Sequence, residues 1–257
     1  MNILFTLCGR AGSKGVKGKN ARDFLDIPLV WYSMAGIKLY IERYGENDHI
    51  DIVLNTDSDD LIRLVEEVKD INIGILRRDA SLAGDKVAKV CVIYDCLRRS
   101  EELYSIKYEM VIDLDITSPL RTVVDIKNTI DRKAMHQETH VVYTVTNSRR
   151  NPYFNMVIKE NGFFCKAISS NFTTRQEAPV FYDMNASIYA YNTMELRKNE
   201  ANKIFEEKCD AVLMYDTGIL DIDSEDDYEL MQVIAKYLFD NKQEYKEILD
   251  KAKSWKL

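Results

Sequence analysis

Short apolar runs alternate with longer segments of helical periodicity over the first 146 residues. After Ser58, for example, Leu61, Leu64, Val65 and Val68 share one helical face. The short runs predict buried strands over Ile3–Cys8, Ile50–Leu54, Ile73–Leu76, Met110–Leu114 and His140–Val145. The longer segments predict helices over Pro28–Tyr44, from Ser58 onward, and over Lys86–Tyr104 and Val123–Met135. This alternation is typical of an α/β fold with a mostly parallel sheet and helices on both faces.

The pattern changes after Thr146. Two short apolar runs flank an Asn161-Gly162 dipeptide and predict an antiparallel hairpin over Met156–Ile158 and Phe163–Ala167. The strand–helix pattern returns after a further predicted strand, Ala186–Tyr191. The strand and helices expected there are Ala211–Tyr215, a helix from Ser224 and a polar helix within 241–257. We therefore divide the chain into an α/β domain, 1–146 with 187–257, and a small antiparallel insertion, 147–186.

The composition fits an enzyme that acts on a small molecule. Hydrophobic residues make up 46% of the 257 residues, enough for a large core. The formal net charge is -7, and the one dense basic cluster lies within a single loop, 10–22. A nucleic-acid-binding surface needs a broader positive patch, so we expect no nucleic-acid partner.

Nothing in the sequence predicts a membrane or secreted protein. The first strand begins at Asn2 without a charged and apolar leader, and no apolar run is long enough to span a bilayer. The five cysteines are odd in number and form no CxxC pair. Reduced cysteines in a cytoplasmic protein, with neither a zinc site nor a disulfide framework, are the expectation.

A glycine-rich basic loop, 9–20, follows the first predicted strand. Its four glycines and four basic residues within one turn suit a polyphosphate, because backbone amides can approach an anion closely there. The glycine spacing and Asn20 in place of Ser or Thr exclude a P-loop, and the glycines do not follow the dinucleotide fingerprint. A flexible, solvated basic turn is the alternative.

Asp221 and Asp223 form the second candidate feature. In an extended segment both side chains point to the same side, which suits a divalent cation bound through oxygen atoms. The alternative is a helix start, where negative charge is favoured. A helix start is sufficient to explain the acidic residues Glu225, Asp226 and Asp227.

Five segments in order resemble the acylneuraminate cytidylyltransferase family, which includes the enzymes for CMP-sialic acid and CMP-legionaminic acid-like sugars. They extend over most of the chain, from Ile3 to about Tyr228. The segments are Arg10-Ala11-Gly12-Ser13-Lys14-Gly15 with Lys19-Asn20; Arg78 to Asp85; Thr117-Ser118-Pro119-Leu120-Arg121; Arg175 to Pro179 with Asn185 to Tyr189; and Asp221-Ile222-Asp223-Ser224-Glu225.

The resemblance implies a three-layer, Rossmann-like nucleotidyltransferase fold and transfer of CMP from CTP to a sialic-acid-like sugar, with Mg²⁺ or Mn²⁺ at Asp221 and Asp223. It implies catalytic roles for Arg10, Lys14, Lys19 and Asp223. The nucleotide-binding residues would be Arg10, Ala11, Gly12, Ser13, Lys19, Asn20, Arg78, Ala83, Gly84 and Asp85. The sugar-binding residues would be Asp115, Thr117, Ser118, Arg175, Gln176 and Asn185. A homodimer would bring Arg175 of the insertion toward the neighbouring active site.

Two departures from the family pattern bear on the sugar. Asp115 stands where the family often has Gln, and Phe154 lies near the place of a lysine in some sialate enzymes. The Asp115 departure means that the family's sugar contact at this position does not transfer directly, and the Phe154 departure favours a sugar other than the ordinary sialic acid. An eight-carbon ketosugar acid and a non-catalytic nucleotide-binding protein of the same fold remain alternatives. The general base is open between Asp223, acting through a metal-bound water, and Asp115.

Overall fold

A seven-stranded sheet forms the centre of the computed structural model, which describes residues 1–12, 15–84, 86–198, 203–219 and 221–256. All neighbouring strands are parallel except at β10, which runs antiparallel to both β6 and β7. The strands, in their order across the sheet, are β11 (Cys209–Leu213), β7 (Val141–Asn147), β10 (Tyr182–Asn192), β6 (Met110–Leu114), β1 (Asn2–Cys8), β4 (His49–Thr56) and β5 (Gly74–Arg77). The predicted α/β class with a mostly parallel sheet is confirmed.

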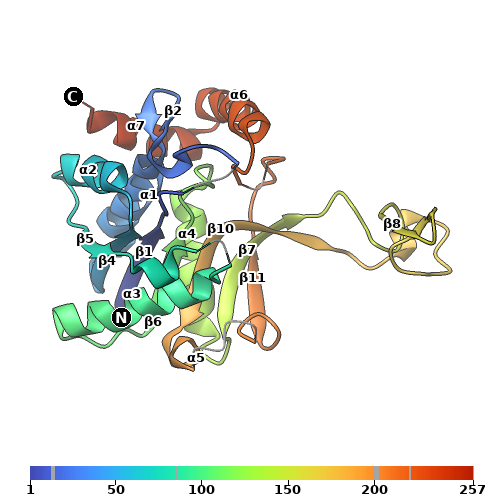
Figure 1. Cartoon of the computed structure of the whole chain (residues 1–257), viewed down its shortest axis with the longest axis horizontal. Helices are drawn as coiled ribbons and strands as arrows, with labels where there is room; N and C mark the ends of the chain where they lie inside the picture. The colour runs from blue at the N-terminus through green and yellow to red at the C-terminus, as the bar shows by residue number, and fades with distance from the viewer. Residues whose placement is uncertain (13–14, 85, 199–202, 220, 257) are drawn as a thin grey trace.

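Helices cover both faces of this sheet and give three layers (Figure 1). On one face α1 (Leu29–Tyr44) packs against α4 (Val123–Met135) and α7 (Gln243–Ser254), with α2 (Asp59–Glu67) and α6 (Glu225–Asn241) beside them. On the other face α3 (Lys89–Tyr104) packs against α5 (Thr193–Arg197). Within the described residues there is no helix long and apolar enough to cross a membrane.

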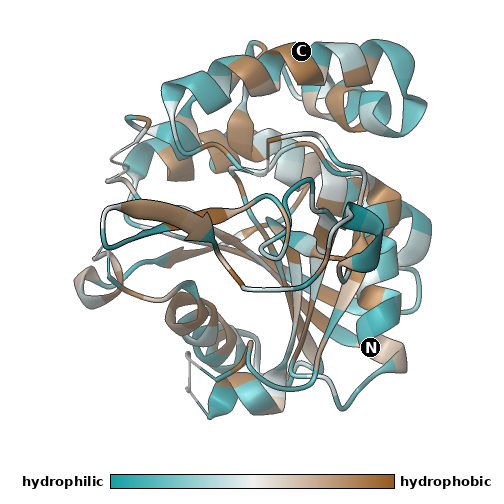
Figure 2. Ribbon diagram, turned by 90° about the vertical axis from the view of Figure 1, so that its right-hand side faces the viewer, coloured by the Kyte–Doolittle hydropathy of each residue, from teal (hydrophilic) through white to brown (hydrophobic). Residues whose placement is uncertain are grey.

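Alternation along β1 divides the core between the two layers. Ile3, Phe5 and Leu7 point into the larger cluster, under α1, whereas Leu4 points into the smaller one, under α3. All four are fully buried, as expected for a strand covered on both faces. The strands in Figure 2 are accordingly hydrophobic along the middle of the sheet.

Side-chain caps fix the start of two helices. Ser224 accepts a hydrogen bond from the Asp227 amide, and the Asp227 carboxylate accepts one from the Ser224 amide, which completes a capping box at α6. Thr122 and Asp125 form the same arrangement at α4. The helix predicted to begin at Ser224 is confirmed, and Asp227 completes its cap.

The predicted strand over 186–191 is longer than expected and belongs to the central sheet. It is the eleven-residue β10, which pairs with β6 over Ile188–Asn192 and with β7 on its other side. The boundary placed between residues 186 and 187 therefore falls inside a strand. Its pairing is irregular between Met184 and Tyr189, where Ala186 has a positive φ of 52°.

The segment between β7 and β10 extends far from the body (Figure 1). We call residues 148–181 the arm. It contains the antiparallel hairpin of β8 (Val157–Glu160) and β9 (Phe163–Lys166) and a short turn of helix, η3 (Arg175–Glu177). Asn161 and Gly162 have φ values of 51° and 88°, so the predicted Asn-Gly turn is confirmed.

Candidate active site

A cavity of about 360 Å³ opens at the carboxyl ends of β1, β5 and β6. Ligands of open α/β sheets bind beyond this edge of the strands. The cavity is lined by Cys8, Arg10, Gly15, Lys19, Asn20, Arg78, Leu82, Gly84, Val87, Lys89, Val92, Asp115, Thr117, Asp221 and Asp223. Residues from four of the five motif segments thus meet at one place.

The basic loop after β1 is fastened at both ends. The Ala11 amide donates to the Asp57 carboxylate at 2.8 Å. At the far end, the buried side chain of Asn20 donates to the Arg10 carbonyl at 3.1 Å and so closes the loop. Gly18 provides the positive φ, 65°, that leads into the helical turn η1 (Lys19–Ala21). The described part of the loop is therefore a defined structure, which argues against a freely solvated turn.

The same loop lies against the Asp221–Asp223 segment. Lys19 donates to the Ile222 carbonyl and forms an ion pair with Asp223 at 3.1 Å. Gly15 approaches so closely that an added Cβ would lie 1.8 Å from the Asp223 carbonyl oxygen. The chain thus joins a basic loop near its start to an acidic segment about 200 residues later.

Arg22 forms a second set of contacts between the basic loop and the start of α6. The Arg22 guanidinium bonds both carboxylate oxygens of Glu225, at 2.7 and 2.8 Å, and lies 3.9 Å from the centre of the Tyr228 ring. Bidentate pairing and ring stacking hold an arginine in one orientation. The acidic start of α6 is therefore connected to the loop as well as being favourable for the helix.

Asp221 and Asp223 leave negative charge at the cavity wall. Burial raises the pKa of Asp221 to about 6, and the carboxylates of Asp223 and Asp115 add to the rise while Lys19 opposes it. A carboxyl group in such surroundings fits a bound cation, which would favour its ionised form. Among the described residues, no three His, Cys, Asp or Glu side chains converge as ligands. An ion here would need further oxygen ligands from substrate or water.

The segment after β5 supplies the opposite wall. The Arg78 side chain donates to the Asn55 side-chain oxygen at 2.7 Å and to the Asn55 carbonyl at 3.0 Å, which fixes the guanidinium at the cavity. Gly84 also lines the cavity, and Ala83 precedes it. Ser13 and Asp85, which the resemblance assigned to nucleotide binding, and Lys14, to which it assigned a catalytic role, lie outside the described residues.

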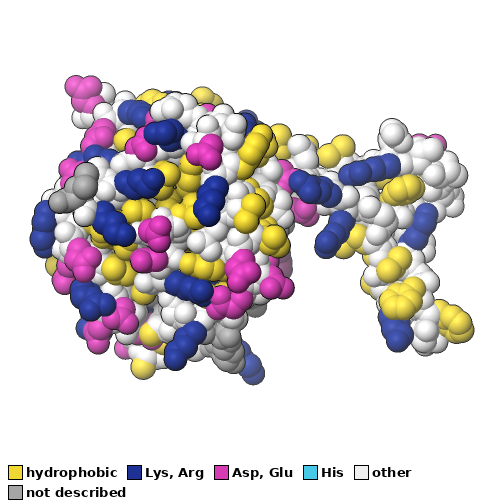
Figure 3. Space-filling view, turned by 90° about the horizontal axis from the view of Figure 1, so that it is seen from above, with side chains coloured by type: hydrophobic (Ala, Val, Ile, Leu, Met, Phe, Trp, Pro, Cys, Tyr) yellow, Lys and Arg dark blue, Asp and Glu magenta, His cyan; other side chains and the backbone are white. Residues whose placement is uncertain are grey.

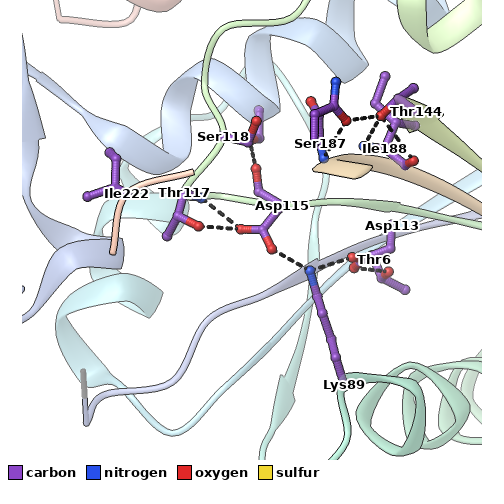
Figure 4. Close-up of polar contacts among 12 residues, drawn as sticks. Thr6, Lys89, Asp113, Asp115, Thr117, Ser118, Thr144, Ser187, Ile188 and Ile222 are labelled. Carbon is purple, nitrogen blue, oxygen red and sulfur yellow. Dashed lines mark hydrogen bonds and ion pairs between the residues drawn. The ribbon is translucent and has the colours of Figure 1, made fainter. Parts of the chain in front are cut away.

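Asp115 lies at the floor of the cavity, one residue beyond the end of β6 (Figure 4). Its Oδ1 accepts hydrogen bonds from the Thr117 amide and hydroxyl at 2.9 and 2.7 Å, and Lys89 approaches its Oδ2 at 2.7 Å. Burial would raise the pKa of Asp115, but Lys89 and Thr117 together lower it to about 2. Asp115 is therefore an ionised, fixed hydrogen-bond acceptor.

Lys89 is the functional candidate that sequence reasoning missed. Its ammonium ion bridges Asp115 and the fully buried Asp113, each at 2.7 Å. The two carboxylates hold the pKa of Lys89 well above its usual value, although burial opposes this. A lysine at the first position of a helix, among several surface lysines, carries no signal in one sequence. The alternation of Asp113 and Asp115 along a strand was the only hint that a cation was needed beside them.

The remaining predicted sugar residues lie away from this cavity within one chain. Ser118 and Asn185 are buried, and Asn185, in β10, accepts from Thr144 of the neighbouring strand β7 at 2.6 Å. Arg175 and Gln176 belong to the arm, where Arg175 donates to the Ser148 and Arg149 carbonyls at 3.3 Å. Arg121, expected to be structural, is almost fully buried and bonds Ser33 and Ser187.

One protein family and two relatives match most of the length of this chain. Residues 7–248 match the family described as Cytidylyltransferase. A Campylobacter coli protein, post-translational flagellin modification protein B, is 36% identical over 91% of this chain and 95% of its own. CMP-N,N'-diacetyllegionaminic acid synthase of Campylobacter jejuni is also 36% identical, over 90% of this chain and 94% of its own.

Solved structures share the fold at low sequence identity. CMP:2-keto-3-deoxy-manno-octonic acid synthetase, complexed with CTP, aligns with a TM-score of 0.61 at 13% identity over 92% of this chain and 99% of that one. The 4-diphosphocytidyl-2C-methyl-D-erythritol synthase of Anaerococcus prevotii aligns with a TM-score of 0.58 at 14% identity over 91% and 96%. These likenesses confirm the predicted nucleotidyltransferase fold. Together with the family match, they show that the chain belongs to the cytidylyltransferases, among the sialic-acid-like branch that its motifs resemble.

Proposed function

We propose that this enzyme transfers CMP from CTP to the anomeric hydroxyl of a sialic-acid-like nonulosonic acid, of the N-acylneuraminate or legionaminate type, and releases pyrophosphate. The observation that carries the proposal is the contact between the basic loop and the Asp221–Asp223 segment at one cavity. The name of the Campylobacter jejuni relative supports the legionaminate-type acceptor. An eight-carbon ketosugar acid, the substrate type in the name of a structural neighbour, is the second candidate.

The proposed reaction is an in-line displacement at the α-phosphorus of CTP. Arg10, Lys14 and Lys19 neutralise phosphate oxygens, on which charge develops during transfer. Asp221 and Asp223 would hold Mg²⁺ or Mn²⁺, since they present carboxylate oxygens beside Lys19 at the cavity wall. A divalent ion bound there supplies further positive charge to the phosphates and orients them. The side chains thus act mainly by positioning and charge stabilisation.

The surroundings of Asp115 and Asp223 favour Asp223 as the general base. A group with a pKa of about 2 is a weak base near neutral pH, and this is the value for Asp115. Asp115 fits a role in orienting the sugar instead. Asp223 is the remaining option, and its side chain is 73% exposed and open to the cavity.

The nucleotide proposal is tested by base selectivity. We expect CTP to be used at least about 100-fold more efficiently than ATP, because the resemblance assigns the Arg78–Gly84 wall to the cytosine base, whose edge its backbone groups can read. Pyrophosphate release is measured with each nucleotide at saturating sugar acid. Equal kcat/KM for CTP and ATP would contradict the assignment of this wall to cytosine.

The arm carries an unusual amount of exposed apolar surface, which we propose is covered by a second copy. Phe163, Phe164 and Val157 are 78%, 71% and 58% exposed. Figure 3 shows hydrophobic side chains at the outer end of the arm and basic side chains along it. A two-stranded hairpin is marginally stable unless it packs on another surface. Exposed aromatic residues in such density mark an interface, and two-fold pairing is the commonest arrangement.

Mixed dimers test whether the arm completes the neighbouring site. We expect Arg175→Ala and Asp223→Asn to be inactive alone but to regain about one quarter of wild-type activity when subunits exchange at equal amounts. Half of the dimers are then mixed, and each mixed dimer has one intact site. The control mixture is Lys19→Ala with Asp223→Asn, since both changes affect the same wall and no site is restored. No recovery after verified exchange would show that Arg175 does not act in trans, and a monomeric protein would remove the dimer proposal.

A further inference from the structure

Lys89 belongs to a network of charged and polar side chains beside the cavity (Figure 4). Its ammonium ion contacts the carboxylates of Asp113 and Asp115, each at 2.7 Å. Asp113 is also fixed by the Thr6 hydroxyl at 2.8 Å. The Tyr189 ring lies beside the ammonium ion, with its centre 5.9 Å away. Lys89 is therefore held between the fully buried Asp113 and Asp115, which lines the cavity.

In the described part of the chain, one acceptor position of the Asp115 carboxylate remains without a donor. A carboxylate offers about four lone-pair positions. Two at Oδ1 are taken by the Thr117 amide and hydroxyl, and one at Oδ2 is taken by Lys89. Among the described residues no further donor to this carboxylate is found, and Asp115 lines the cavity. The remaining position at Oδ2 is thus available to a donor of a bound molecule.

Lys89 limits the negative charge that this network presents to an anionic acceptor. Asp113, Asp115 and Lys89 together carry one net negative charge, which becomes two if the lysine is lost. A cavity proposed to receive a triphosphate and a sugar acid would then repel both substrates more strongly. Lys89 also fixes the direction in which Oδ2 points, because it occupies the other position on that oxygen.

We propose that Lys89 is a positioning residue that determines specificity for the sugar, holding Asp115 so that Oδ2 accepts a hydrogen bond from a hydroxyl or amide N–H of the acid. This inference rests on the proposed function. It assigns the Lys89–Asp115 pair to the place where the related family often has a neutral glutamine. A neutral amide can both donate and accept, whereas the ionised Asp115 carboxylate only accepts. The pair therefore selects for a donor on the sugar at this point.

A double-mutant cycle tests the pair. Lys89→Met should raise the KM for the best nonulosonic acid by about 30-fold, as expected when one partner of a hydrogen-bonded charge pair is removed, and should change the KM for CTP by less than about threefold. Asp115→Asn should raise the same KM, because the amide places a donor where the acceptor was. In the Asp115→Asn background, Lys89→Met should have no further effect on the sugar KM, since Lys89 acts through Asp115. Equal effects of Lys89→Met in both backgrounds would overturn the proposal, as would an equal rise for CTP.

Two measures guard against loss of folding. Lys89→Met leaves the buried Asp113 without its cation, so the cycle is repeated in an Asp113→Asn background, which removes that charge. Lys107→Met is the matched control, because this lysine is 80% exposed and pairs with Glu101 far from the cavity. If the wild-type enzyme turns over no acid at all, the proposed function fails and this inference fails with it. If the wild type is active and the cycle shows no coupling, only the inference is wrong.

Discussion

Replacing Asp223 with asparagine should reduce kcat by about 1,000-fold or more while the fold survives. The substitution removes one of two carboxylates proposed to hold the divalent ion, and charge stabilisation of a transferring phosphate is worth about this much. The Asp223 side chain is 73% exposed, and its ion pair with Lys19 is not part of the core. A surface pair of this kind contributes little to stability, so the thermal unfolding temperature should stay close to that of the wild type.

The measurement compares single-turnover pyrophosphate release with CTP binding. We expect CTP binding to weaken much less than kcat falls, because the charge is needed most in the transition state. Asp226→Asn is the matched control, since this exposed aspartate lies three residues further on in the first turn of α6. Near-normal turnover by a folded Asp223→Asn protein would remove the metal assignment.

Replacing Gly15 with alanine should reduce kcat/KM by about 100-fold. The added Cβ would lie 1.8 Å from the Asp223 carbonyl oxygen, a distance that no pair of these atoms tolerates. The loop or the acidic segment must therefore move apart. A displacement of about 1 Å in a site that works by positioning costs about this factor. The core is not involved, so the protein should remain folded.

Gly12→Ala provides the comparison within the same loop. Among the described residues no atom lies within 4 Å of a Cβ added at Gly12, so the loss of activity should be clearly smaller than for Gly15→Ala. Steady-state kinetics and thermal unfolding of both variants check the prediction. Equal losses from the two changes would mean that general stiffening of the loop, rather than its contact with Asp223, limits the reaction.

The sequence predicts the parallel part of the fold well because periodicity reports burial directly. Buried parallel strands such as β1 and β6 are continuous apolar runs, and the start of α6 has a cap with its own signature. The pairing of β10 is not predictable in this way. Its first three residues are exposed where it leaves the arm and its second half is buried, so only the buried half resembles a strand in the sequence.

The residues of the candidate site also differ in whether the sequence predicts them. Arg10, Lys19, Asp221 and Asp223 stand in recognisable segments, and all four line the cavity. Lys89 could not be predicted, because its importance comes from Asp113 and Asp115, which reach it only through packing of α3 on β6. The roles assigned to Arg175 and Gln176 stay predictions, since a single chain does not bring the arm to its own cavity.

The central claim is tested most directly by pyrophosphate release from CTP and Mg²⁺ with a panel of acceptors: N-acylneuraminic acid, legionaminic-type acids and an eight-carbon ketosugar acid. The account predicts release with at least one nine-carbon nonulosonic acid, formation of its CMP conjugate by mass spectrometry, and a kcat/KM at least about tenfold above that for the eight-carbon acid. Preference for the eight-carbon acid, or release with none of the acids by a folded protein that binds CTP, would contradict it.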